Sequence, residues 1–144
     1  MLHVKGKVSY FGGPDDMGVS SSEGLALEEE GVNPDNPDKE HLFLEEQPPG
    51  TTGNARRLDP DALYLALRWD YDQFSKDRLA GDEMAMIYAP STGKKCLASP
   101  VDWGPHVDTG RQADASPGVL LALGGLETDD TVEITYPAPA KANA

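Results

Sequence analysis

Short runs of alternating apolar and polar residues, separated by glycine and proline, set the pattern of this chain. Residues 2–11 alternate through Val4, Val8 and Tyr10 around lysines, which predicts a strand. The same pattern predicts further strands at residues 64–71, 83–89, 94–99 and 129–136. The turn Pro90–Gly93 joins two of these strands into a hairpin.

Helical signals occur in two places. Ser116 supplies an N-cap, Pro117 suits the first helical position, and a glycine pair ends the apolar run, so we predict a short helix at 118–123. The second place is 64–71, where alanine and leucine favour helix but the aromatic residues favour strand. We interpret it as a strand. The segment from Asp102 to Asp114 is interpreted as loop and turn.

Composition narrows the fold class. Glycine and proline are frequent, at 15 and 12 of 144 residues, which favours short strands over a helical bundle. The length fits one domain, and closing the sheet into a barrel would remove its edges. Proline density excludes a barrel strand in the acidic segment 28–58, which we predict to be an insertion anchored by His41–Leu44. The barrel domain then spans 1–136, followed by a flexible tail at 137–144.

Charge and cysteine content exclude several classes of function. The net charge of −13 disfavours nucleic acid and anionic membranes as partners. The N-terminus lacks the apolar core of a signal peptide, and no segment is long enough to span a membrane. We therefore expect a protein that is cytoplasmic as synthesised or carried on a phage particle. Cys96 is the sole cysteine and is predicted to be a buried strand thiol; the scattered histidines predict no metal site, and no cofactor motif occurs.

Asp102 is the first candidate for chemistry. Its carboxyl group lies in Asp-Trp-Gly-Pro-His, next to the indole of Trp103, and partial desolvation there would raise its pKa toward that of a general acid. The alternative is a carboxylate that accepts hydrogen bonds in a turn. Glu23 and His106 are further candidates for acid–base work, although Glu23 is one of many acids in its region.

The order of motifs from residue 97 to 136 carries a resemblance. Asp-x-Gly-Pro at 102–105 is followed by Gly-Arg at 110–111, Asp-x-Ser at 114–116 and a short apolar helix ending in Leu-Gly. This order resembles the double-psi β-barrel of the rare lipoprotein A and expansin-like families. Residues 6–13 and Ser20–Gly24 are similar to the family's opening strand and its Ser-Gly-Glu loop. The resemblance implies a mainly β, six-stranded double-psi-like barrel with one short helix and the acidic insertion.

The resemblance also implies a site. Asp102 occupies the position of the acid in the lytic transglycosylases of the rare lipoprotein A family, and Glu23 that of a supporting glutamate. The family's histidine is missing from the matching stretch, where Arg68 and Trp69 stand, and Trp103 replaces an arginine. The side chains expected to bind sugar are Trp103, Trp69, Tyr71 and Arg68. Asp114 is expected to hold the loop before the helix, and Arg111 to pair with Asp114, Asp108 or a carboxylate across the barrel.

These observations lead to a function hypothesis with open alternatives. We expect a cell-wall glycan-directed barrel that binds peptidoglycan or another polysaccharide, with lytic transglycosylase-like cleavage by Asp102 as general acid. The alternative is a non-enzymatic structural or carbohydrate-binding module, such as a bacteriophage virion component in contact with other virion proteins. A protease-inhibitor-like barrel is a third option.

Overall fold

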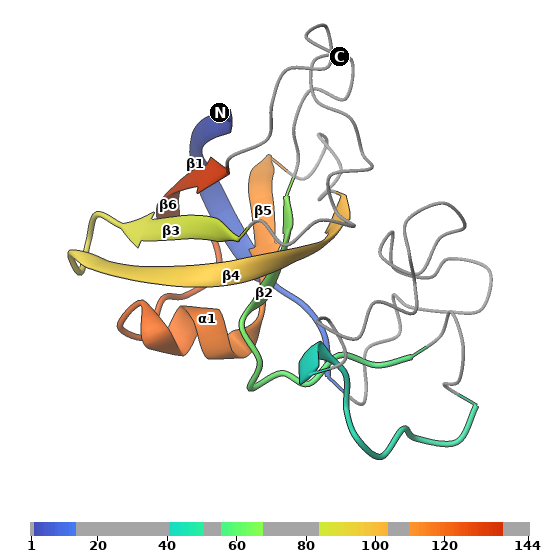
Figure 1. Ribbon diagram of the computed structural model, residues 1–144. Coiled ribbons are helices and arrows are strands. Elements are labelled where there is room, and N and C mark those ends of the chain that lie inside the picture. The colour runs from blue at the N-terminus through green and yellow to red at the C-terminus, as the bar shows by residue number, and fades with distance from the viewer. Residues whose placement is uncertain (1, 14–40, 51–55, 68–83, 104–109, 137–144) are drawn as a thin grey trace, which may run out of the picture.

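The computed structural model describes residues 2–13, 41–50, 56–67, 84–103 and 110–136. Within them the chain forms β1 (Leu2–Tyr10), β2 (Tyr64–Leu67), β3 (Ala85–Ala89), β4 (Lys94–Trp103), β5 (Arg111–Ala115), α1 (Pro117–Ala122) and β6 (Thr131–Tyr136). The strands close into a barrel in the order β1-β5-β2-β4-β3-β6, and α1 covers one end of it (Figure 1). The prediction of a mainly β, closed six-stranded barrel with one short helix is confirmed.

The two halves of the chain alternate around the barrel. Strands β1, β5, β2, β4, β3 and β6 follow one another, so each hydrogen-bonded pair takes one strand from β1–β3 and one from β4–β6. The pairs β1–β5 and β2–β4 are parallel, and the other four are antiparallel. Exchanging β1 with β4, β2 with β5 and β3 with β6 reproduces the same set of neighbours. The strand order is therefore symmetric between the two halves.

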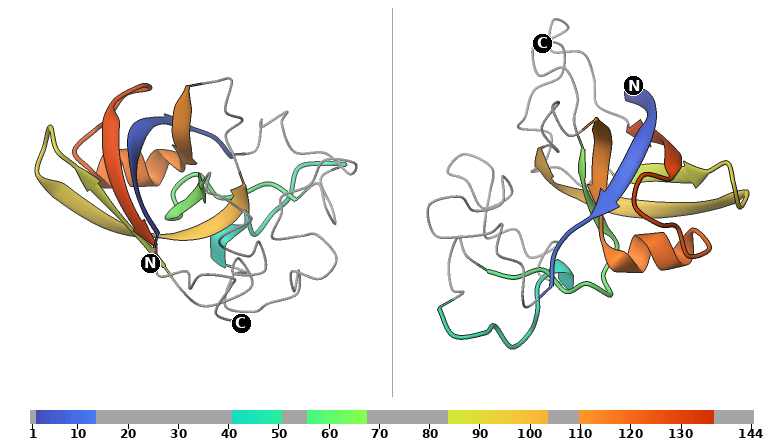
Figure 2. Two further views of the ribbon diagram at one scale, coloured as in Figure 1. Left: turned by 90° about the horizontal axis from the view of Figure 1, so that it is seen from above. Right: turned by 180° about the vertical axis from the view of Figure 1, so that it is seen from behind.

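Alternate residues of the strands fill the barrel. Register partners share a face of the sheet, so the buried pairs Ile87–Cys96 and Leu65–Ala115 point inward from four different strands. The same buried cluster includes Val8, Ala113, Val132 and Ile134. The view along the barrel shows the strands enclosing this interior (Figure 2, left). Cys96 lies in β4 with its side chain buried, as predicted, and burial raises the pKa of its thiol.

Helix α1 begins where the Ser-Pro signal predicts. The Oγ of Ser116 accepts a hydrogen bond from the N–H of Val119 at 3.1 Å, and Pro117 is the first helical residue. The same Oγ accepts from the N–H of Tyr64 at 3.4 Å, which ties the start of the helix to β2. After the helix, Gly124 has φ 101° and Gly125 has φ 83°, the left-handed region that glycine adopts most readily. The helix ends one residue earlier than predicted, at Ala122.

Two strand predictions need correction. The segment before the helix was predicted as loop and turn, but residues 111–115 form strand β5 between β1 and β2. Strand β4 was predicted to end at residue 99, but it continues to Trp103, so Asp102 lies on a strand rather than in a tight loop. Elsewhere β1, β3 and β6 lie within the predicted ranges, and β2 covers 64–67 of the predicted 64–71, whose remaining residues lie outside the described part of the chain.

The described part of the predicted insertion lies against the barrel. Leu42, Phe43 and Leu58 are buried and belong to the core cluster. Phe43 and Leu58 form an isolated antiparallel bridge, and the guanidinium of Arg56 lies 3.8 Å from the centre of the Phe43 ring. In the described residues of this segment no strand belongs to the barrel. Residues 28–40 and the tail at 137–144 fall outside the described residues.

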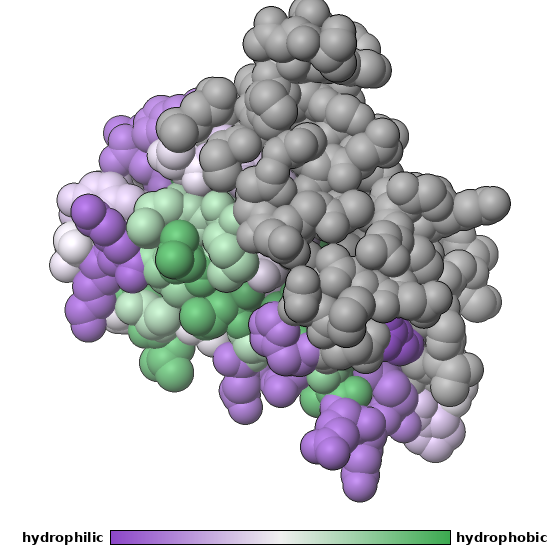
Figure 3. Space-filling model, viewed as in Figure 1, coloured by the Kyte–Doolittle hydropathy of each residue, from purple (hydrophilic) through white to green (hydrophobic). Residues whose placement is uncertain are grey.

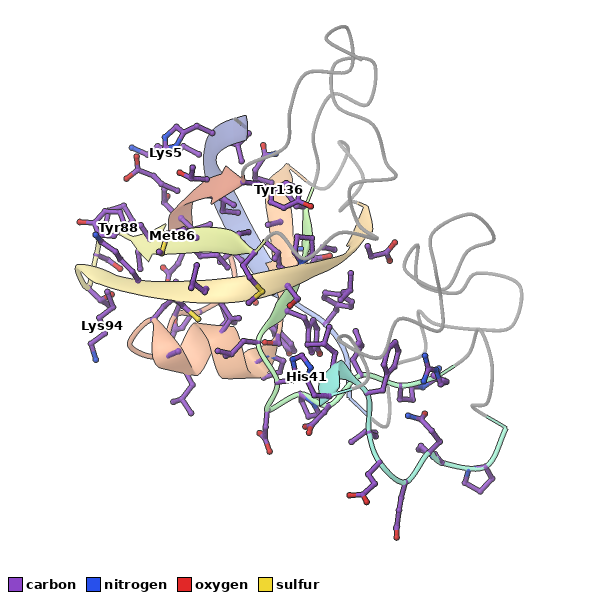
Figure 4. The ribbon with its side chains drawn as sticks, in the orientation of Figure 1. Lys5, His41, Met86, Tyr88, Lys94 and Tyr136 are labelled. Carbon is purple, nitrogen blue, oxygen red and sulfur yellow. The ribbon has the colours of Figure 1, made fainter. Side chains whose placement is uncertain are left out.

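One outer face of the barrel is apolar. Met86 of β3 and Leu97 of β4 are register partners, and both side chains are exposed. The space-filling view shows an apolar surface over these strands (Figure 3), and the labelled sticks show Met86 and Tyr88 on β3 (Figure 4). Among the described residues, no helix has the length and apolar content that a membrane crossing requires.

Candidate functional site

Four neighbouring strands place Ser9, Asp114, Ala66 and Asp102 side by side in one row. Ser9 of β1 is the register partner of Asp114 in β5, Asp114 is the partner of Ala66 in β2, and Ala66 is the partner of Asp102 in β4. We call these residues the carboxylate row. Ala113 and Ala115 on either side of Asp114 are buried, so Asp114 and its partners face outward. The row therefore displays two carboxyl groups on the outer surface, with a small residue between them.

A register shift in β4 brings Asp102 to this face. Leu65 pairs with Pro100, but the next residue, Ala66, pairs with Asp102, so Val101 is an extra residue in β4. Cys96 and Ala98 point inward, and strict alternation would carry Asp102 inward as well. The extra residue reverses the alternation and turns Asp102 outward, as bulges do beside functional sites. Asp102 is half-buried there.

The separation of the two carboxyl groups follows from strand spacing. Neighbouring strands lie about 4.8 Å apart, so the Cα atoms of Asp102 and Asp114 are about 10 Å apart, with β2 between them. Ala66 between them ends at Cβ and is 5% exposed, so the two carboxyl groups flank a small, buried side chain.

Burial and the charge of Arg111 shift the pKa of Asp114 in opposite directions. Burial raises the pKa of the Asp114 carboxyl above its ordinary value of 3.8, and the positive charge of Arg111 partly opposes that increase. Arg111 itself donates from Nε to Oδ1 of Asp129 at 3.0 Å, so its ion pair is with the segment before β6. The pKa of Asp114 remains raised, and its carboxyl group holds a proton to a higher pH than an ordinary aspartate does.

Tyr64 fixes the end of β1 next to the row. Its hydroxyl donates to the carbonyl of Phe11 at 2.7 Å, and the two rings pack edge to face with centres 5.2 Å apart. Gly12 has φ 96°, and a Cβ at that position would overlap the Tyr64 hydroxyl. Glycine meets both requirements, because it adopts a positive φ readily and has no Cβ to overlap the Tyr64 hydroxyl.

The structure brings together some of the predicted site residues. Asp102 of β4 and Asp114 of β5 lie on either side of β2, Arg111 is the first residue of β5, and Trp103 is the last residue of β4. Glu23, Arg68, Trp69, Tyr71 and His106 lie outside the described residues, so they stay predictions. Asp114 was expected to hold a loop; it is instead a strand residue in the row. Its sequence signal is weak, because Ala113, Asp114 and Ala115 alternate but the polar residues Arg111 and Gln112 precede them.

No metal-binding cluster is evident in the described part of the chain. Its His, Cys, Asp and Glu residues include no group of three or more that could hold a metal ion. A polar cavity of about 610 Å³ lies elsewhere, between His41, Glu45, Arg56 and Asp59. The carboxylate row is therefore the candidate site supported by two independent features, its register and the raised pKa of Asp114.

Comparison with known proteins supports the fold. No protein-family model matches the chain, and no curated protein matches its sequence. Among solved structures, the Streptomyces papain inhibitor is similar to it, with a TM-score of 0.52. The two chains are 13% identical, and the match covers 94% of each. At that identity the similarity extends to the barrel architecture alone.

Proposed function

We propose that this protein acts on cell-wall glycans and that the carboxylate row is its site. The supporting observation is the pair of outward carboxyl groups on either side of Ala66, together with the burial that raises the pKa of Asp114. Two carboxyl groups of different pKa can divide acid and base work between them. The motif resemblance at Asp102 supports a glycosidic bond as the target.

The proposed reaction is a lytic transglycosylation. Asp114, in its protonated form, donates a proton to the glycosidic oxygen as the bond to C1 breaks. Asp102, as the carboxylate, accepts the proton of the C6 hydroxyl of the same sugar, whose oxygen attacks C1 and closes a 1,6-anhydro ring. No water is consumed, and both carboxyl groups exchange protonation states. This assigns Asp102 the role of base, whereas the sequence alone pointed to it as the acid.

In the sequence, the aromatic residues predicted to bind sugar lie at or just after the ends of β2 and β4. Leu67 and Trp103 are register partners at the ends of the parallel strands β2 and β4. The chain therefore continues from both strands at one edge. Trp103 is adjacent to Asp102, and Trp69 and Tyr71 follow Leu67 within four positions of the sequence. Aromatic side chains of this kind stack on the apolar faces of sugars.

The experiment measures soluble anhydro-muropeptides released from purified sacculi by the wild type, Asp114→Asn and Asp102→Asn. We expect each variant to lose about 10²–10⁴ in rate, because general acid–base catalysis contributes that much. Asp61→Asn is the matched control, since Asp61 is an exposed aspartate outside the row. Equal release by all four proteins would remove the row from the mechanism, and no release by a folded wild type would contradict an enzymatic role.

Binding is measured in the same preparation. Co-sedimentation of inactive protein with sacculi would favour the non-enzymatic carbohydrate-binding module, for which a virion component is one example. The name of the similar solved structure also motivates a papain inhibition assay as a further arm. Inhibition of papain without sacculus binding would replace the glycan proposal by a protease-inhibitor function.

A further inference from the structure

An apolar pocket lies between the end of β1 and helix α1, away from the carboxylate row. Its volume is about 340 Å³, within the range of ligand sites. None of the row residues lines it. The view from behind shows the end of β1 above α1, with the segment leading to β6 beside the helix (Figure 2, right). We call it the helix pocket.

The floor and the walls of the helix pocket differ in exposure. Leu120 and Leu126 form its floor and are each 7% exposed. Tyr10 and Leu121 form its walls and are 59% and 76% exposed, respectively. Covering such an exposed leucine with a partner removes apolar surface from water and so favours binding. A small ligand on the floor would leave much of both walls wet, so an extended chain that also covers the walls fits the site better.

The helix pocket is held in shape by backbone hydrogen bonds. The N–H groups of Gly125 and Leu126 both donate to the carbonyl of Leu120, at 2.9 and 3.1 Å. The N–H of Glu127 donates to Oδ2 of Asp130 at 2.7 Å, and the N–H of Asp130 donates to the carbonyl of Glu127 at 3.1 Å. This frame positions Glu127 before a partner arrives, which lowers the entropy cost of binding.

The charge around the helix pocket selects the partner. Among the described residues that line it, Glu127 carries a charge, Thr128 adds a hydroxyl group, and none is Lys, Arg or His. Asp129 in the same turn is paired with Arg111, so the local excess of negative charge comes from Glu127 and Asp130, within a chain of net charge −13. An acidic partner would be repelled, whereas a basic one would be attracted.

We propose that the helix pocket docks a basic segment of a partner protein. A leucine- or phenylalanine-sized side chain enters between Tyr10 and Leu121, and an adjacent lysine or arginine pairs with Glu127. This surface is independent of the proposed glycan chemistry, because it shares no residue with the carboxylate row.

The test is an NMR titration of the ¹⁵N-labelled full chain with two probe peptides, acetyl-Lys-Leu-Phe-Lys-amide and acetyl-Glu-Leu-Phe-Glu-amide. We expect the basic peptide to shift the amides of Tyr10 and of residues 120–128 at millimolar concentration, and the acidic peptide to shift none of them. Leu121→Ser should weaken binding about tenfold through lost apolar contact. Glu127→Gln should weaken it about threefold, and only at low salt.

Leu97→Ser is the matched control, because it removes an exposed leucine from another face of the barrel. It should leave the titration unchanged. Equal binding of both peptides, shifts confined to other regions, or no shift with either peptide would each overturn the proposal. Leu121 is largely exposed, so its variant is expected to fold, and the comparison of the two peptides on the wild type does not depend on it.

Discussion

The two halves of the barrel have equivalent strand orders and different chemistry. When the two halves are exchanged in the strand order, β1 takes the place of β4 and β5 takes the place of β2. The carboxylate row maps onto itself under this exchange, with Ser9 matched to Asp102 and Ala66 to Asp114. The first half therefore contributes a hydroxyl and a methyl group where the second half contributes two carboxyl groups.

This difference separates what the fold requires from what a site requires. Both halves supply inward apolar residues at alternate positions, because the closed barrel needs them on every strand. The outward positions of the row are under no such demand, and there the halves diverge. Each parallel pair also carries one extra residue, Gln112 of β5 against β1 and Val101 of β4 against β2, and both extra residues belong to the second half. The candidate site thus lies at positions that do not fill the barrel interior.

Removing both carboxyl groups leaves neither half with a carboxyl group in the row, and it should have the largest effect on activity. We expect the double variant Asp102→Asn, Asp114→Asn to lose about 10²–10⁴ in glycan cleavage, no more than the worse of the two single variants, because the groups act as one unit. The measurement is anhydro-muropeptide release, with a thermal melt to show that the fold persists. A loss equal to the product of the single losses would contradict joint action.

Adding a carboxyl group to the first half should destabilise the barrel. In Ala66→Asp a buried alanine becomes an aspartate between Asp102 and Asp114, with cost from burial and from like charges. We expect a loss of about 1–3 kcal/mol at pH 7, measured by urea unfolding. The loss should shrink at acid pH, where the carboxyl groups are protonated. A loss independent of pH would show that packing, not charge, is responsible.

Ser116 links the two halves through its hydrogen bonds. Removing its hydroxyl group should lower the free energy of unfolding slightly less than Ala66→Asp does. Its Oγ accepts from Val119 and Tyr64, and its N–H donates to the carbonyl of Tyr64 at 2.9 Å. Loss of such an N-cap costs about 1–2 kcal/mol, and we expect Ser116→Ala to fall in that range by urea unfolding. Thr128→Ala, at an exposed turn position, is the control. Equal stability of the two variants would mean that the cap does not join α1 to β2.

The smallest expected effect is the contribution of Asp114 to stability as pH changes. Its folded-state pKa is raised above its ordinary value of 3.8, so the folded state holds the proton more tightly than the unfolded state. Relative to Asp114→Asn, the wild type should be most stable at a pH below this ordinary pKa. It should lose stability as the pH rises through the raised pKa of Asp114. Unfolding free energies at several pH values test this. A difference that grows with pH would contradict it.

Sequence patterns predicted the parts of the fold that carry strong local signals. The Ser-Pro cap and the glycine pair located α1, and alternation located β1, β3 and β6. Strand β5 was missed because its residues Arg111, Gln112 and Asp114 give it the polarity of a loop, and only its pairing with two strands makes it regular.

The candidate site was predicted only in part, for a related reason. The motif identified Asp102, but the carboxylate row depends on register between distant strands, and the shift at Val101 has no local signature. Asp114 was assigned a loop-holding role because its strand was not recognised. Burial, which raises its pKa, is likewise a property of the assembled barrel and not of its neighbours in the sequence.

The alternation of strands around the barrel has a consequence for how the chain folds. Because no two neighbouring strands come from the same half, neither half can form a sheet by itself. Leu2 pairs with Tyr136, at the opposite end of the described chain, so the contacts that close the barrel span nearly its full length. Proteins dominated by such non-local pairs fold slowly. On the ribosome, β1 must wait without a hydrogen-bonding partner until β5 and β6 have been synthesised.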